Sequence, residues 1–140
     1  MQPSAGIDYL ANEIRTAAPQ KLRLMLIEGA LRCGRQALEF WRDQDREQAS
    51  EALIRCQQIV TELICSLDSR HHSQLVGRIA GIYLFIFRSL VAAHLHQDEA
   101  RLAEAMSVLE VERETWRQVC ANHLSAADSQ AERERSDFSA

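Results

Sequence analysis

Hydrophobic residues recur along this chain at spacings of three and four, in blocks separated by short polar breaks. This spacing places apolar side chains on one side of an α-helix. Prolines and glycines, which would interrupt helices, number only two and five in the whole chain. The pattern predicts four helices, at residues 19–43, 46–67, 73–96 and 99–121.

Residues at the predicted helix ends support these boundaries. Pro19 suits the first position of a helix. Asp45 and Asp98 are the expected N-caps of the second and fourth helices, and Gln48 can complete a capping box with Asp45. Helices of about 20 residues joined by short links favour antiparallel neighbours. The expected fold is therefore all-α, an antiparallel up-and-down four-helix bundle.

The first predicted helix carries two apolar stripes on opposite sides, when each residue is turned by about 100°. Periodicity does not tell which stripe faces the core, but the other one then needs a second partner. One stripe consists of Leu22, Leu26, Gly29, Cys33, Ala37 and Phe40. The opposite stripe consists of Leu24, Ile27, Leu31 and Leu38.

The third predicted helix is apolar over more than half of its circumference, which a surface helix does not need. It is therefore either the most buried helix or one that receives a ligand. The apolar arc is centred near Tyr83 and Phe87. Ile82 lies about 100° from this centre and Phe85 lies nearly opposite, so neither is required to close a four-helix core.

The two ends of the chain differ. Residues 1–15 carry Ile7 and Tyr9 and are expected to dock on an apolar surface of the bundle, which occupies residues 16–121. Residues 122–140 lack apolar periodicity and are predicted to be a disordered tail.

Composition restricts the possible functions. The 140 residues suffice for one domain, and the net charge of −4 comes without a block of basic residues, which argues against nucleic-acid binding. The N-terminus lacks the regions of a secretory signal. The most apolar run, from Ile79 to Phe87, is far shorter than the roughly 20 residues of a membrane span. We expect a cytoplasmic protein that does not insert into membranes.

No constellation of catalytic or metal-binding residues stands out. The four cysteines are not spaced as Cys-x-x-Cys and are expected to be small core residues. His94 and His96 are two residues apart, so a helix points them in different directions, and His94 lies on an apolar face. We predict a binding protein rather than an enzyme, with no catalytic residue, no metal and no cofactor.

Several short motifs follow one another in a specific order. They are TAAPQKL at residues 16–22, MLIEGAL at 25–31, QQIVTELICSLD at 57–68 and IYLFI at 82–86, followed by Asp98, Leu102 and Trp116. Their order and spacing, over about residues 7–120, resemble the flagellin-export chaperones of the FliS family. The chain departs from the family pattern at Ile27, Glu28, His72, Ser73, Arg78 and His94.

This resemblance implies a function. Members of the family hold the C-terminal segment of flagellin along apolar grooves, prevent its premature polymerisation and deliver it to the type III export gate. Their N-terminal segment can cap the empty site, which would make residues 1–15 a lid. The expected partner-binding residues are Ile7, Tyr9, Leu24, Ile27, Leu31, Ile82, Phe85 and Ile86.

Two alternatives remain open. A helical adaptor or regulator could use the same grooves to bind a different amphipathic helix. An exposed apolar groove also favours a homodimer.

Overall fold

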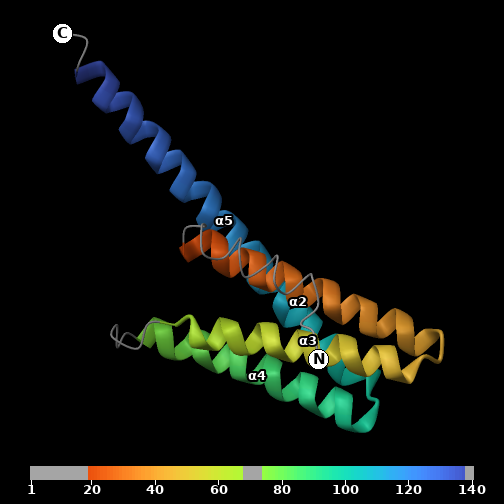
Figure 1. Cartoon of the computed structure of the whole chain (residues 1–140). Coiled ribbons are helices and arrows are strands. Elements are labelled where there is room, and N and C mark those ends of the chain that lie inside the picture. Colours follow the sequence, from red (N-terminus) through yellow and green to blue (C-terminus); the bar gives the residue numbers. More distant parts are fainter. Residues whose placement is uncertain (1–18, 68–73, 138–140) are drawn as a thin grey trace.

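The computed structural model describes residues 19–67 and 74–137. They form four helices: α2 (Pro19–Arg42), α3 (Arg46–Cys65), α4 (Gln74–His96) and α5 (Glu99–Asp137). Figure 1 shows three helices of similar length beside the first part of a much longer α5. The prediction of an all-α four-helix bundle is confirmed. The predicted lid, with Ile7 and Tyr9, lies outside the described residues.

Each helix runs antiparallel to its neighbours. Near the start of α2, Arg23 lies 3.5 Å from Ser66 at the end of α3. Further along α2, the carbonyl of Ala30 accepts a hydrogen bond from Cys56, which comes earlier in α3. Within the described ranges, α2 packs against α3 and α5, α4 packs against the same two helices, and the backbones of the diagonal pairs do not approach each other closely. The bundle is therefore a closed ring of four helices in which each has one side open to solvent.

The two short turns of the bundle are built alike. Gln44 and Gln97 adopt the left-handed conformation, with φ angles of 60° and 53°. The following aspartates, Asp45 and Asp98, donate their backbone N–H to the carbonyls of Phe40 and Ala93 at the ends of the preceding helices. This is the Schellman arrangement.

The same two aspartates also begin the next helices. The Asp45 side chain accepts from the N–H of Gln48, and the Asp98 side chain accepts from the N–H groups of Ala100 and Arg101. The predicted N-caps are confirmed, and in each turn one Gln-Asp pair ends the first helix and begins the next.

The core takes side chains from both predicted stripes of α2. Leu26 is 2% exposed and Ile27 is fully buried, and Ala37 and Leu31 lie beside them in the same cluster. The expectation that one stripe would remain outside the core is therefore wrong. The physical reason is that α2 is covered on two sides, by α3 and by α5, so its buried arc spans parts of both stripes.

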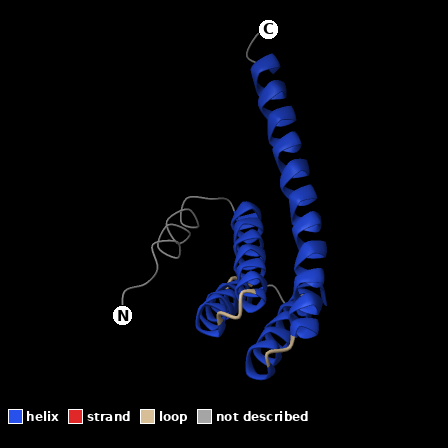
Figure 2. Ribbon diagram, turned by 90° about the vertical axis from the view of Figure 1, so that its right-hand side faces the viewer, coloured by secondary structure: helices blue, strands red, loops and turns tan. Residues whose placement is uncertain are grey.

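Helix α5 continues well beyond the bundle, as Figures 1 and 2 show. Trp116 of α5 lies under Arg23, which stands in the first two turns of α2, so α5 passes the start of α2 soon afterwards. Every residue at positions 121–137 is exposed.

The prediction of disorder is therefore wrong for residues 122–137, which are helical. These residues include several alanines, glutamates and arginines, which have high helix propensity. They also extend an existing helix, so the cost of nucleation does not arise again.

We predict that deleting residues 124–140 changes the melting temperature by no more than about two degrees, because the helical part of this segment is exposed throughout. Circular dichroism should record a smaller helical signal for the truncated protein, with the thermal unfolding midpoint nearly unchanged. A Leu109→Ala variant, which leaves a cavity in the core, should lose about 2–5 kcal/mol in the same measurement. A large loss of stability on truncation would mean that the segment packs on the bundle.

Candidate partner-binding surface

Helix α4 exposes large apolar side chains on the side that faces away from the bundle. Leu84 is 42% exposed, Phe85 46% and Leu95 72%. Helix geometry places them about 100–160° away from Tyr83, which points into the core. We call this side the outer face of α4. It consists of Gly77, Gly81, Leu84, Phe85, Arg88, Ala92 and Leu95.

The opposite side of α4 fills the core with Tyr83, Ile86, Leu90 and Ala93. By length and apolar composition this 23-residue helix could cross a membrane. In the bundle, 22% of its most apolar window is buried. The sequence analysis measured only the uninterrupted run between two arginines, and so underestimated the apolar length. The buried side identifies α4 as a bundle helix, and its remaining apolar side chains are left without a cover.

A buried carboxylate connects the helices near one end of the bundle. Glu112 of α5 is 7% exposed and accepts hydrogen bonds from the Tyr83 hydroxyl of α4 (3.4 Å) and the Trp116 indole N–H (3.0 Å). The guanidinium of Arg23 lies 4.6 Å from the centroid of the Trp116 ring, a cation–π contact from α2. We call these four residues the polar cluster.

Burial keeps the Tyr83 hydroxyl neutral. Burial, and then the nearby Glu112 carboxylate, raise the pKa of the Tyr83 hydroxyl above its ordinary value. A tyrosine in the unfolded chain ionises near pH 10. The stabilisation from neutral Tyr83 is therefore fully present below about pH 10 and is lost as the pH rises above it.

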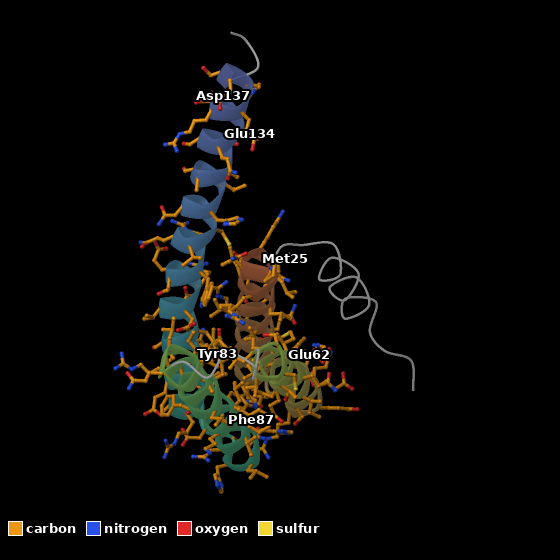
Figure 3. The ribbon with its side chains drawn as sticks, turned by 90° about the vertical axis from the view of Figure 1, so that its left-hand side faces the viewer. Met25, Glu62, Tyr83, Phe87, Glu134 and Asp137 are labelled. Atoms are coloured by element: carbon orange, nitrogen blue, oxygen red, sulfur yellow. The ribbon has the colours of Figure 1, made fainter. Side chains whose placement is uncertain are left out.

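Beyond the polar cluster the bundle is only partly filled. Among the described residues, fully buried positions begin at Leu26 in α2 and at Tyr83 in α4, and they stop at Leu63 in α3. The helices continue past this level, and Figure 3 shows Met25 near the start of α2 on one side of Tyr83, with Phe87 on the other. We call this part the open end. Its half-buried apolar residues are Leu22, Leu24, Met25, Ile64, Leu67, Val76, Ile79 and Ile82.

The residues predicted from sequence fall into three environments. Phe85 is exposed on the outer face of α4, and Leu24 and Ile82 are half-buried at the open end. The third environment is the core, which buries Ile27, Leu31 and Ile86. A partner does not reach these three side chains in this conformation.

Leu84 and Leu95 are exposed residues that the sequence analysis did not select. Their positions fall on the margin of the apolar arc, where periodicity alone does not separate core from surface. The glycines at positions 77 and 81 could have indicated an exposed side of this helix. A Cβ atom at either position would meet nothing within 4 Å, so no packing within the described bundle requires a glycine there.

The described residues contain no group of three or more histidines, cysteines or acids that could hold a metal ion. Cys56 is the one fully buried cysteine of that part. Burial, followed by the influence of Cys33, raises the pKa of its thiol, and it donates a hydrogen bond to the Ala30 carbonyl. It thus behaves as the expected small core residue, whereas Cys65 is exposed.

Comparison with known proteins identifies the family. The family model described as "Flagellar protein FliS" matches residues 1–123. The chain belongs to the FliS family. The FliS proteins of Bacillus subtilis (strain 168) and Campylobacter jejuni are named flagellar secretion chaperones. The Bacillus subtilis protein is 33% identical to this chain over 79% of this chain and 81% of its own length. The Campylobacter jejuni protein is also 33% identical, over 84% of this chain and 92% of its own length.

The resemblance inferred from the motifs is confirmed by these matches. FliS is a family of chaperones and not of enzymes, which agrees with a surface whose main feature is exposed apolar area. The match ends at residue 123, close to the point where α5 leaves the bundle.

We predict that Glu112→Ala lowers the free energy of unfolding by about 2–4 kcal/mol, because it leaves the buried donors of Tyr83 and Trp116 without an acceptor. Urea denaturation measures this loss. The matched control is Glu114→Ala on the same helix, whose exposed pair with Arg117 should contribute less than about 1 kcal/mol. Equal effects of the two substitutions would show that the polar cluster is not a stabilising contact.

Proposed function

We propose that this FliS-family protein is a cytoplasmic export chaperone that binds the C-terminal segment of flagellin. In this role it keeps flagellin from polymerising early and delivers it to the type III export apparatus. The proposal rests on family membership and on one observation, the uncovered outer face of α4.

The outer face has the properties of a peptide-binding surface. It extends from Gly77 to Leu95, a length of about 27 Å at 1.5 Å per residue. Arg88 is the charged residue within it and the exposed Arg78 lies at its margin, while exposed apolar area of this kind marks interaction sites in soluble proteins. The open sites beside Gly77 and Gly81 leave room for a partner's backbone to approach α4 closely.

The open end offers a second apolar area for the same partner. Ile82 and Leu24 lie there, half-buried. A client that is disordered when free can wrap around both areas, and its ordering cost keeps affinity per unit area modest. Such modest affinity suits a chaperone that must later release its client.

Residues 1–15 are proposed to act as a lid on this surface, through Ile7 and Tyr9. A segment that covers apolar side chains in the empty chaperone would limit self-association. Flagellin would then have to displace it.

We predict that Phe85→Ser weakens binding of a flagellin C-terminal peptide about fivefold or more, the loss expected for part of one apolar contact, while the melting temperature stays nearly unchanged. Isothermal titration calorimetry with the peptide from the same genome measures this. The matched control is Ile54→Ser on α3, which removes a side chain that is 44% exposed and should leave binding intact.

Phe87→Ser supplies the opposite comparison. Phe87 is packed against the core, so this variant should lose several kcal/mol of stability. If Phe85→Ser unfolds the protein or leaves binding unchanged, the outer face of α4 is not the client surface. If the peptide does not bind while another helical protein co-purifies, the adaptor function is correct. A dimer of the free protein in gel filtration that Phe85→Ser dissociates would assign this face to self-association.

The lid makes a separate prediction. Replacing both Ile7 and Tyr9 with alanine should change peptide affinity by more than about 1 kcal/mol, the scale of one or two apolar contacts. Affinity should rise if residues 1–15 only compete with the client, and fall if they are part of the bound site. Calorimetry of the double variant decides between these two roles, and an unchanged affinity would remove the segment from the mechanism.

A further inference from the structure

A basic hollow lies between α2 and α5, on the side of α5 that packs against α2 rather than α4. Its volume is about 240 Å³. The three arginines that line it come from two helices, since Arg32 and Arg35 belong to α2 and Arg113 to α5. Glu28 and the buried Leu31 complete the lining.

The ion pairs around the hollow leave one positive charge unbalanced. Arg35 and Arg113 both bind the same carboxylate, that of Glu110, at 2.6 and 3.1 Å. Arg32 is exposed and has no ion pair or hydrogen bond with any described residue. Three guanidinium groups therefore face two carboxylates, those of Glu28 and Glu110.

One donor at this site is also left unused. The Nε atom of Arg113 is buried and has no hydrogen-bond acceptor among the described residues. Buried polar atoms in folded proteins are nearly always hydrogen-bonded, because an unpaired buried donor loses its contact with water without compensation. The hollow thus combines the unpaired guanidinium of Arg32 with the unsatisfied Nε–H donor of Arg113, on two adjacent helices.

We propose that this hollow is a subsite for a carboxylate of the bound client segment. The planar guanidinium group matches a carboxylate in shape and binds it through charge-assisted hydrogen bonds. A single negative charge balances the site, whereas a doubly charged phosphate would leave it with an excess negative charge. The inference rests on the proposed function, since the carboxylate belongs to the client.

The subsite lies within reach of a client on the outer face of α4. α4 and α2 both pack against α5 and lie diagonally across the bundle from each other, so a client on the outer face of α4 must cross α5 to reach the hollow. Val111, which is 67% exposed and lies two residues before Arg113, provides an apolar contact on the way. Crossing one helix of about 10 Å diameter takes three or four residues of extended chain.

The test compares three versions of the flagellin C-terminal peptide. One is unmodified, one carries a C-terminal amide, and one has its Asp and Glu residues replaced by Asn and Gln. Each is titrated calorimetrically into the wild type and into a variant with both Arg32→Gln and Arg113→Gln. Arg42→Gln is the matched control, because Arg42 is exposed on the same helix as Arg32 and outside the hollow.

We expect one of the two neutralised peptides to bind the wild type roughly tenfold more weakly, the scale of one charge-assisted hydrogen bond. Which one does so tells whether the carboxylate is terminal or from a side chain. The difference should disappear in the double variant and persist in Arg42→Gln. Arg32→Gln alone should retain part of the difference in affinity between the charged and neutralised peptides. Because Arg32 is exposed, this single substitution should leave the stability of the fold unchanged.

The proposal is overturned if all three peptides bind the wild type equally, or if the charged peptide's advantage survives in the double variant. In both cases peptide binding itself continues, and the chaperone function stands. If none of the peptides binds the wild type, the proposed function fails, and the subsite fails with it.

Discussion

The polar cluster around the buried carboxylate of Glu112 joins three of the four described helices. A buried charge is costly unless it is hydrogen-bonded. Trp116 supplies one donor from the helix of Glu112 itself, and the Tyr83 hydroxyl supplies another from α4, so this second contact favours one register of α4 against α5. The Arg23 guanidinium over Trp116 extends the same constraint to α2. Fully buried side chains stop at about the level of the polar cluster, although the helices continue.

The arrangement of helices as a ring explains why α4 carries the exposed apolar surface. Each helix has two neighbours and one free side, and for a stable monomer the free side should be polar. α2, with a neighbour on either side, buries parts of both of its apolar stripes in the core. α4 has the same number of neighbours and more apolar residues than they cover, so the excess, including Phe85 and Leu95, faces outward.

The sequence predicted those features that depend on neighbouring residues in the chain. The starts of the helices and the caps at Asp45 and Asp98 depend on local backbone chemistry, and the structure contains them, although the last helix ends well beyond its predicted boundary. The exposure of Phe85 followed from helix periodicity alone. The burial of Ile27 and Leu31 was not predictable in the same way, because it depends on which helices cover α2. The sequence analysis also missed the role of Glu112. The residues next to Glu112 in the chain resemble those around any surface acid, and its contact with Tyr83 depends on how α4 and α5 pack.

The contributions to client binding that we propose for the outer face of α4 and for the basic hollow differ in kind. Apolar contacts supply affinity but tolerate sliding, because one aliphatic side chain replaces another at little cost. A charged contact is directional, and a shift by one residue of extended chain moves a carboxylate about 3.4 Å away from the arginines. A client with apolar residues but no carboxylate at the right spacing would thus leave the Arg113 donor unpaired. In the function proposed here, the apolar face would let the chaperone hold an unfolded segment, and the arginines would determine which segment it holds and in which register.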